Sequence, residues 1–309
     1  MLGPDETGLT RATEILRAGG LVAFPTETVY GLGADACNGK AVAQIFAAKD
    51  RPAFNPLIVH VATLEMAQNI ARFGDPALRL ATAFWPGPLT LVLPLHEDAC
   101  IAPIVTADLP TIGLRLPEHP VAQRLLNTFG GPVAAPSANL SGKISPTTAA
   151  HVANGLSGRI DAILDAGPCK VGLESTIIGF DPVPTLLRPG GLPVEVIEAC
   201  LGAPLAERQT SETPNAPGQL TSHYAPKSPI RLNAKNKSAK ELKLGFGPDA
   251  DADLNLSPSG DLTEAAANLF THLHALDRKG RPIAVAPIPK TGLGIAINDR
   301  LMRAAAPRN

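Results

Sequence analysis

The sequence lacks the features that mark several large classes of protein. It contains no run of about eighteen apolar residues, so no segment is predicted to cross a membrane as a helix. The first residues include acids where a secretory signal would be basic and then apolar, and we therefore expect a cytosolic protein. The 27 basic and 28 acidic residues nearly cancel, so the whole-molecule charge does not point to nucleic acid or lipid. Any anion-binding site must be local.

Cysteine and aromatic residues are also scarce. The four cysteines form no Cys-x-x-Cys pair, which argues against a zinc site and indicates reduced thiols. They are Cys37, Cys100, Cys169 and Cys200. His272 and His274 would point to nearly opposite sides of a helix, so they cannot share a metal ion. The P-loop pattern GxxxxGKS/T is missing as well, so a bound nucleotide would need another kind of cradle.

Helical and strand-like patterns alternate over the first two thirds of the chain. Helical spacing of apolar residues predicts helices near 7–18, 41–49, 63–73, 76–84, 119–128, 147–155 and 193–200. Short apolar runs predict strands at 21–24, 56–61, 89–95, 111–116, 132–135, 160–165, 175–180 and 185–188. The alternation predicts an α/β domain over residues 1–202.

The pattern changes after residue 202. Residues 203–229 are rich in Pro, Ser and Thr without an apolar period, which predicts a linker. Residues 230–309 are then expected to form a small α/β unit. Its elements are predicted as strands at 229–233 and 282–288 and helices at 260–280 and 295–306, with a capping box from Asp261 to Glu264. The basic residues from Lys227 to Lys243 and the DADAD run at 249–253 are interpreted as solvated surface.

The segment KDRPAFNPLIVH, residues 49–60, surrounds a short apolar strand with polar groups. Lys49 and Arg51 fall where a helix ends, and a cation there is favoured by the helix dipole without any ligand. His60 shares a face of the strand with Ile58, and such a histidine is most often a hydrogen-bonded core residue. This interpretation explains one cation, but not two cations together with Asn55.

Other strands open into hydroxyls and glycines at their carboxyl ends, where open α/β sheets bind ligands. These segments are FPTETVYGLGA (24–34), APSANLSGKISPT (135–147), GLESTIIGF (172–180) and LLRPGG (186–191). Each taken alone is also explained by ordinary turns. Arg115 lies within a predicted strand, and a buried arginine needs either an acidic neighbour or a bound carboxylate or phosphate.

Taken in order, FPTETVYGLGA, AAKDRPAFNPLIVH, FWPGPLTLVL, APSANLSG and GLESTII closely resemble the YrdC-type L-threonylcarbamoyladenylate synthases, over roughly residues 9–200. The segments PGQLTSHYAP and GLGIAINDRLMRAA resemble the long, two-domain form of that family. The resemblance implies a YrdC-like α/β domain with a twisted, mostly mixed sheet, flanking helices and a large concave cleft. It also implies a small Rossmann-like C-terminal domain.

The resemblance implies an ATP-dependent nucleotidyltransferase. Threonine and bicarbonate would form a carbamate, whose oxygen attacks the α-phosphorus of ATP to give threonylcarbamoyl-AMP and pyrophosphate. The product would supply the group that a separate complex attaches to adenosine 37 of tRNA, so transient contact with that complex or with tRNA is expected. We expect Mg²⁺ to arrive with ATP, with no organic cofactor and no metal held by the protein.

The family's site residues carry over by motif. Five are implied to bind threonine: Thr28, His60, Arg115, Ala135 and Ser175. Seven are implied to bind ATP: Arg51, Asn55, Thr111, Ser137, Ser145, Arg188 and Tyr224. Lys49 and Arg51 would act in catalysis, because fixed cations stabilise the charge that develops on the phosphoryl oxygens.

Tyr224 belongs to the linker, and we expect HYAP to fold over the cleft as a lid that excludes water. Two alternatives remain. The first is an RNA-binding module, for tRNA or double-stranded RNA, without turnover. The second is a carbamoyl-transfer enzyme like those that mature hydrogenase metal centres. The sequence argues against this second alternative, because it lacks zinc-finger cysteine pairs and an acylphosphatase-like segment.

Overall fold

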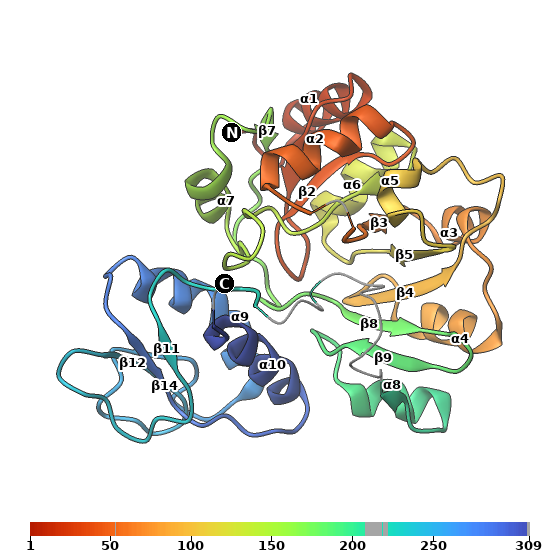
Figure 1. Cartoon of the computed structure of the whole chain (residues 1–309). Coiled ribbons are helices and arrows are strands. Elements are labelled where there is room, and N and C mark those ends of the chain that lie inside the picture. Colours follow the sequence, from red (N-terminus) through yellow and green to blue (C-terminus); the bar gives the residue numbers. More distant parts are fainter. Residues whose placement is uncertain (53, 208–217, 219–221, 308–309) are drawn as a thin grey trace.

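Two β-sheets organise the chain (Figure 1). The structure is a computed structural model, which describes residues 1–52, 54–207, 218 and 222–307. The larger sheet belongs to the first two thirds of the chain, and the smaller sheet follows the linker. This arrangement confirms the predicted α/β fold.

The larger sheet has ten strands in the order β10-β9-β8-β4-β5-β3-β6-β2-β1-β7. The strands are β1 (Val22–Phe24), β2 (Gly31–Asp35), β3 (Ile58–His60), β4 (Leu89–Pro94), β5 (Thr111–Arg115), β6 (Val133–Ala134), β7 (Ala162–Ile163), β8 (Thr176–Gly179), β9 (Thr185–Arg188) and β10 (Ala206–Glu207). Neighbours β3 and β5 are parallel, as are β4 and β8, whereas β4 and β5 are antiparallel. The sheet is therefore mixed, as predicted.

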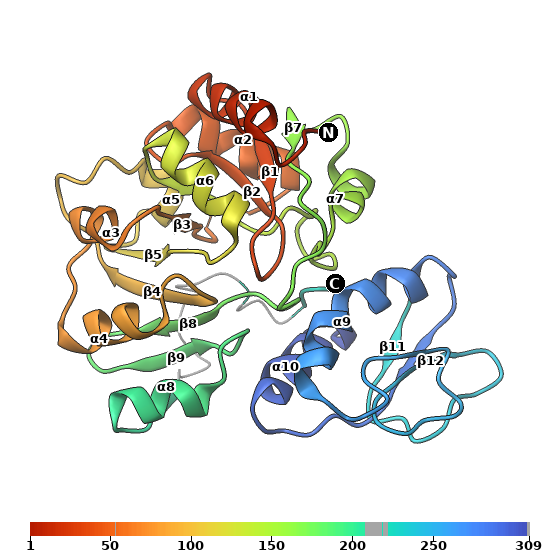
Figure 2. The ribbon, with the colours of Figure 1, turned by 180° about the vertical axis from the view of Figure 1, so that it is seen from behind.

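Eight helices of the described chain flank this sheet, as Figure 1 and the reverse view in Figure 2 show. They are α1 (Glu6–Arg17), α2 (Gly39–Lys49), α3 (Leu64–Ile70), α4 (Asp75–Phe84), α5 (Pro103–Thr106), α6 (Pro120–Phe129), α7 (Ala149–Leu156) and α8 (Val194–Leu201). Helix α2 begins where the Asn38 side chain accepts hydrogen bonds from the N–H groups of Lys40 and Ala41. It ends at Lys49, and the C-cap residue Asp50 has a left-handed φ of 51°. These two signals place Lys49 at the last position of the helix and Arg51 just after its C-cap.

The smaller unit has a four-stranded, fully parallel sheet in the order β11-β14-β12-β13. Its elements are β11 (Ile230–Arg231), β12 (Leu242–Gly245), β13 (Leu254–Asn255), α9 (Leu262–Asp277), β14 (Ile283–Val285) and α10 (Leu293–Ala305). Asp261 caps α9 as predicted, by accepting from the N–H groups of Thr263 and Glu264. The other half of the predicted capping box was wrong, because the Glu264 carboxylate accepts from the Ser257 hydroxyl rather than from the Asp261 N–H.

Two predictions about local structure were wrong. Residues 31–35 form strand β2, although the sequence predicted no strand there; β2 consists mostly of small residues and pairs with β1 and β6. Lys243 was interpreted as solvated surface, but it lies on buried strand β12 and is 4% exposed. Its ammonium group is paired at 2.8 Å with Asp249, which belongs to the DADAD run. The acidic run therefore supplies a partner for a buried cation.

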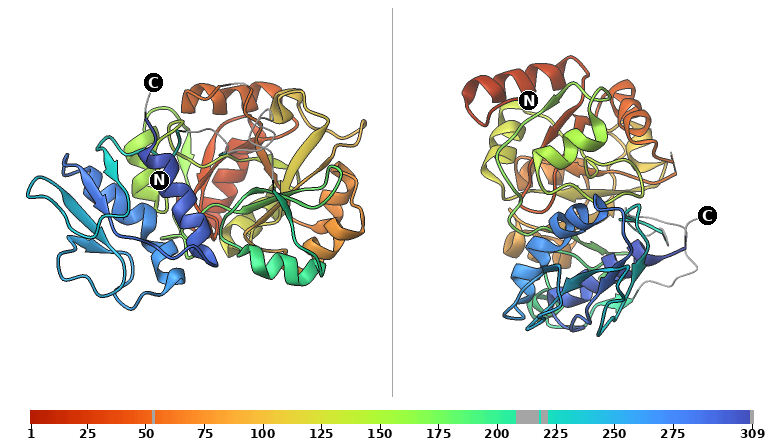
Figure 3. Two further views of the ribbon diagram at one scale, coloured as in Figure 1. Left: turned by 60° about the horizontal axis from the view of Figure 1, so that its bottom comes forward. Right: turned by 90° about the vertical axis from the view of Figure 1, so that its left-hand side faces the viewer.

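Helices α9 and α10 lie between the small sheet and the larger unit, as Figure 1 and the two views of Figure 3 show. The hydroxyls of Thr147 and Thr271 are 3.0 Å apart across this junction. Gly172 has a φ of +74°, and a Cβ on it would lie 2.5 Å from the Ala266 carbonyl oxygen in α9. The backbone of the larger unit therefore approaches α9 too closely for any other residue. This contact places the C-terminal helices directly behind segments that line the cleft.

Candidate active site

One cleft in the larger unit gathers nine of the residues predicted to bind the two substrates. Five of the nine belong to the predicted threonine set: Thr28, His60, Arg115, Ala135 and Ser175. The other four belong to the predicted ATP set: Arg51, Ser137, Arg188 and Tyr224. They come from strands, loops and the linker, so the fold brings together segments that are far apart in the sequence.

Sheet pairing explains how three of these residues meet. Strands β3 and β5 are parallel, and their register places His60 beside Arg115. Strand β6 runs antiparallel on the other side of β3, and the Ala135 N–H that follows it donates to the Ile58 carbonyl oxygen at 2.9 Å. Ala135 therefore lies beside Ile58, two residues before His60 on β3, and alternate strand residues share a face. His60, Arg115 and Ala135 all line the cleft.

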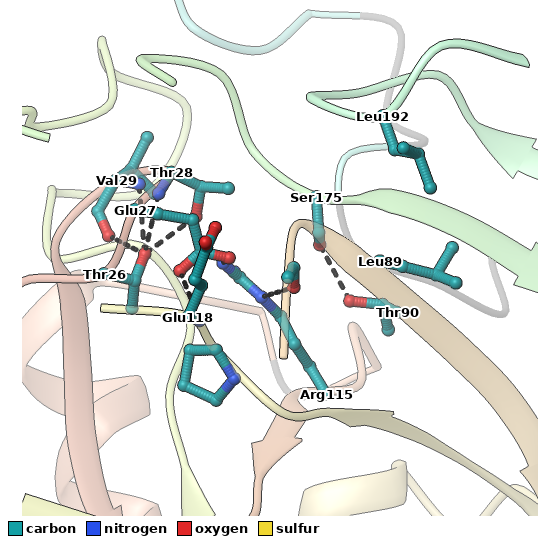
Figure 4. Close-up of polar contacts among 12 residues, drawn as sticks. Thr26, Glu27, Thr28, Val29, Leu89, Thr90, Arg115, Glu118, Ser175 and Leu192 are labelled. Atoms are coloured by element: carbon teal, nitrogen blue, oxygen red, sulfur yellow. Dashed lines mark hydrogen bonds and ion pairs between the residues drawn. The ribbon is translucent and has the colours of Figure 1, made fainter. Parts of the chain in front are cut away.

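Arg115 has the acidic neighbour that one of the two sequence interpretations required. Figure 4 shows its guanidinium group between the 26–29 loop and Ser175. Its Nη2 lies 2.6 Å from Glu27 Oε1, and both side chains are almost fully buried. The second oxygen of Glu27 accepts from the Glu118 N–H at 3.1 Å, and Arg115 Nε donates to the Gly87 carbonyl oxygen at 3.3 Å. The cation is therefore held rigidly in place before any substrate arrives.

Hydroxyl groups lie on both sides of this cation (Figure 4). Thr26 and Thr28 share a hydrogen bond of 2.8 Å between their hydroxyls, and Thr26 also donates to the Val29 carbonyl oxygen at 2.7 Å. Ser175 is 2.7 Å from the Thr90 hydroxyl on the neighbouring strand. Thr26 lines the cleft and was missed by the sequence reasoning. Its position two residues before Thr28 was the available signal.

His60 is buried and lies against the edge of Phe24, with ring centroids 6.0 Å apart. Burial, and then the charge of Arg115, lowers the pKa of His60 to about 3. The ring is therefore neutral at neutral pH. Its Nδ1 finds no hydrogen-bond partner among the described residues, and it lines the cleft. A polar ligand in the cleft is the natural partner for this nitrogen.

Lys49 lies behind the cleft wall and holds a loop. Its ammonium group donates to the carbonyl oxygens of Ser137 and Asn139, which fixes the backbone beside the predicted ATP residue Ser137. Burial, and then the charge of Arg51, lowers the pKa of Lys49. Burial likewise lowers the pKa of Arg51 to about 10, with Arg188 adding to the effect. Mutually repelling cations in one buried place favour a bound anion.

Glu174 is a cleft-lining carboxylate that the sequence reasoning missed. It accepts from the Ser145 hydroxyl at 2.5 Å and from Arg300 Nε at 2.8 Å. Burial favours its neutral form, but the charges of Arg300 and Arg188 outweigh burial and hold the pKa of this carboxyl below its usual range. Arg300 belongs to α10, so the C-terminal unit supplies a cation to the back of the cleft.

Tyr224 is buried in the cleft with a left-handed φ of +59°. The guanidinium carbon of Arg300 lies 5.0 Å from the centre of its ring, a cation–π contact. Gly218 lies close to the Tyr224 hydroxyl, because a Cβ on Gly218 would be 2.7 Å from it. This placement agrees with the expectation that the linker enters the cleft. The rest of the predicted lid, residues 208–217 and 219–221, lies outside the described residues.

Four predicted residues do not line this cleft. Lys49 lies behind it, and Ser145 reaches it only through Glu174. The carbonyl oxygen of buried Asn55 accepts from Arg51 Nε at 3.3 Å. Thr111 lies on the wall of a small neighbouring cavity together with Thr90. Their direct roles toward ATP remain predictions.

No group of three His, Cys, Asp or Glu side chains in the described ranges is placed to hold a metal ion. Within the same ranges, every helix is too short or too polar to span a bilayer.

Comparison with protein families shows two consecutive matches. The Sua5/YciO/YrdC family model, described as telomere recombination, matches residues 14–190. A second model, described as the C-terminal domain of threonylcarbamoyl-AMP synthase, matches residues 192–306.

Individual relatives match nearly the whole chain. A threonylcarbamoyl-AMP synthase of Bacillus subtilis is 41% identical over 332 residues, covering 99% of this chain and 95% of the relative. One of Pyrococcus abyssi is 41% identical over 327 residues, covering 98% of this chain and 96% of the relative. The crystal structure of P. abyssi Sua5 complexed with L-threonine matches with a TM-score of 0.90 at 40% identity, covering 97% of this chain and 95% of that one.

Proposed function

The chain belongs to the Sua5/YciO/YrdC family, and from this premise we propose that its cleft makes threonylcarbamoyl-AMP and pyrophosphate from L-threonine, bicarbonate and ATP. Relatives that match it over nearly their whole length are threonylcarbamoyl-AMP synthases, and a similar structure contains L-threonine. The observation that carries the proposal is the single cleft in which nine residues predicted for the two substrates meet.

The reaction needs two bond-forming steps. The threonine amine adds to the carbon of bicarbonate with loss of water, which gives a carbamate. A carbamate oxygen then attacks the α-phosphorus of ATP, and pyrophosphate leaves. The nucleophile belongs to the substrate, so the protein's task is to position the reactants and to stabilise charge.

The threonine end of the cleft is assigned to the fixed Arg115, neutral His60 and the hydroxyls around them. Arg115 is already oriented by Glu27 and Gly87, and its remaining N–H groups suit a carboxylate. His60 offers Nδ1 to a polar group of the amino acid. Because Glu27 neutralises Arg115, this end is suited to a zwitterionic substrate rather than to a polyanion.

The ATP end is assigned to Arg51, Arg188 and Ser137, with Lys49 supporting Ser137 from behind. Arg51 and Arg188 both line the cleft, where Glu174 is the only acid among the described lining residues. Glu174 is in turn paired with Arg300, so this end keeps an excess of positive charge. That excess suits a triphosphate and the pyrophosphate that departs from it.

We assign the activity to the nucleotidyltransferases, since an adenylyl group is transferred to a carbamate. The donor set of the cleft offers guanidinium groups and hydroxyls with one already paired carboxylate, which suits Mg²⁺ carried by the phosphates rather than by the protein. Mg²⁺ would lower the charge repulsion between the triphosphate and the attacking carbamate. We further propose a cytoplasmic protein whose product passes to the tRNA threonylcarbamoyl-transfer machinery.

Pyrophosphate release from ATP tests the proposal. We expect release that requires both threonine and bicarbonate, and an adenylate product visible by mass spectrometry. Arg51→Met should lower kcat/KM for ATP by about tenfold or more, since a charge-assisted hydrogen bond is worth about 1.5 to 3 kcal/mol. Arg159→Met is the matched control, because Arg159 is exposed and pairs with Asp50 next to Arg51. Release that does not depend on threonine would refute the assignment, and tRNA binding without turnover would favour the RNA-binding alternative.

A further inference from the structure

Cys37 and Cys100 lie together on the surface of the larger unit, away from the residues that line the cleft. They are 63 positions apart in the sequence. Cys37 precedes α2, and Cys100 precedes α5. The Cys37 thiol donates to the Cys100 carbonyl oxygen at 2.5 Å, so the two residues are in direct contact. The fold has therefore placed the Cys37 sulfur against the backbone that carries the Cys100 thiol.

The two segments that carry these cysteines are joined through their backbones. The Ala102 N–H donates to the Ala36 carbonyl oxygen at 2.9 Å, so the two segments run next to each other. The Cys37 N–H donates to Asp35 Oδ1 at 2.9 Å, which fixes the turn that carries this thiol. A disulfide requires Cα atoms about 4.4 to 6.8 Å apart, and the contact between the Cys37 thiol and the Cys100 carbonyl oxygen puts such a separation within reach of the pair.

We propose that Cys37 and Cys100 are a redox-active pair that forms an intramolecular disulfide with a low-molecular-weight disulfide as oxidant. Cys100 is exposed and Cys37 is half-buried, so Cys100 meets the oxidant first. The Cys100 thiolate attacks one sulfur of the oxidant, and one thiolate leaves. The Cys37 thiolate then attacks the Cys100 sulfur of the mixed disulfide, and the second thiolate leaves. The protein loses two electrons and two protons, and the oxidant becomes two thiols.

The two steps should differ in rate. Burial, and then the neighbouring Cys100, raises the pKa of Cys37 to about 12. Few Cys37 side chains are therefore thiolates at neutral pH, so the second step is the slower one and accelerates as the pH rises. A mixed disulfide on Cys100 is the expected transient species.

The bond would clamp two elements next to the cleft. Helix α2 starts after Cys37 and ends at Lys49, while α5 follows Cys100 and accepts a hydrogen bond from the Leu57 N–H through the Val105 carbonyl oxygen. The segment that carries Arg51 runs between these two anchor points. Closing a loop of this length also restricts the unfolded chain, so oxidation should raise the midpoint of thermal unfolding.

The test treats the full chain with oxidised glutathione at about pH 8.5, where an ordinary thiol is half ionised. We expect an intact mass lower by about 2 Da, because two hydrogens leave, and a cross-linked peptide that contains both cysteines. Cys37→Ser should end as a glutathione adduct on Cys100, and its thermal midpoint should not rise. Cys200→Ser is the matched control, because half-buried Cys200 lies elsewhere and the variant should behave as the wild type does.

A wild-type chain that accumulates a stable adduct on Cys100 without the cross-link would overturn the proposal. So would a cross-link that involves Cys169 or Cys200 in place of either member of the pair. Both readouts are mass and unfolding temperature rather than turnover, so they do not depend on the proposed synthesis.

Discussion

Replacing Arg300 with methionine removes a cation from the back of the cleft and keeps most of the apolar stem of the side chain. Arg300 is fully buried on α10. Its Nε lies 2.8 Å from Glu174 Oε2 and its Nη1 lies 2.6 Å from Asp299 Oδ2. Its guanidinium carbon is 5.0 Å from the Tyr224 ring. One substitution therefore breaks contacts in the linker, in the C-terminal helix and in the cleft wall.

The expected loss of unfolding free energy follows from the charge that stays behind. Glu174 would remain buried without Arg300, and breaking a buried ion pair in this way costs about 3 to 5 kcal/mol. The lost cation–π contact is worth about 2 kcal/mol when it is desolvated, but it overlaps with the first effect and does not simply add. We expect Arg300→Met to destabilise the chain by about 3 to 5 kcal/mol at neutral pH.

The pH dependence distinguishes a charge effect from a packing effect. In the wild type, Arg300 and Arg188 hold the pKa of Glu174 below its usual range, so this carboxylate stabilises the fold above its ordinary pKa of 4.5. That contribution disappears as the pH falls through the lowered value. In the variant, burial would raise the pKa, and protonation would relieve the cost. The gap between wild type and variant should therefore shrink as the pH falls.

Urea unfolding at pH 7 and pH 5 measures this gap, and Arg303→Met is the control. Arg303 lies one turn further along α10, is 23% exposed and is 3.0 Å from Asp299. A partly exposed pair of this kind is worth less than about 1 kcal/mol. Equal losses in the two variants, or a gap that widens in acid, would refute the reasoning.

Three further results are expected. His60→Ala should raise KM for threonine by about tenfold, equivalent to one lost hydrogen bond of about 1.4 kcal/mol, while KM for ATP stays within about twofold. Equal effects on both KM values would contradict the assignment of His60 to the threonine end of the cleft. His60→Asn should also lose less unfolding free energy than the wild type as the pH falls from 6.5 to 3, the range between the ordinary and folded pKa values of His60. At pH 5 the low pKa of His60 costs the wild type about 2 kcal/mol of unfolding free energy, and urea titrations of both proteins measure this difference. Both proteins keep some acid sensitivity, because burial also lowers the pKa of His223. Gly218→Ala should weaken ATP binding in a calorimetric titration, because its Cβ would lie 2.7 Å from the Tyr224 hydroxyl and its φ is +84°. Unchanged affinity would mean that Gly218 and Tyr224 separate when ATP binds.

Local patterns predicted the outline of the fold well, because strands with apolar runs and capped helices carry their signals within a few residues. Helix α2 was expected near 41–49 and spans Gly39–Lys49, and β9 was predicted with its observed ends. Strand β2 was missed because residues 31–35 have few large side chains, and its stability comes from pairing on both edges.

Long-range partners were harder to predict. The sequence required a partner for Arg115 but left its nature open, and Glu27 lies 88 positions away. Glu174 and Arg300 are 126 positions apart, and on a helix such as α10 an arginine gives no sign that it is buried. The predicted threonine residues all line one cleft because they lie at strand ends or next to them. Asn55 and Thr111 lie beside the cleft, because the sequence pattern does not show which way a residue before a strand or at its start will face.

The double anchoring of Glu174 makes the two units difficult to exchange. Its carboxylate accepts a hydrogen bond from each unit, from Ser145 in the larger unit and from Arg300 in α10. A chimera that joined this unit to a foreign C-terminal unit without an arginine at that point would leave Glu174 without its ion-pair partner, beside the proposed triphosphate site. Such a graft would repel its own substrate, so successful recombination should either retain the arginine or replace position 174 with a neutral residue.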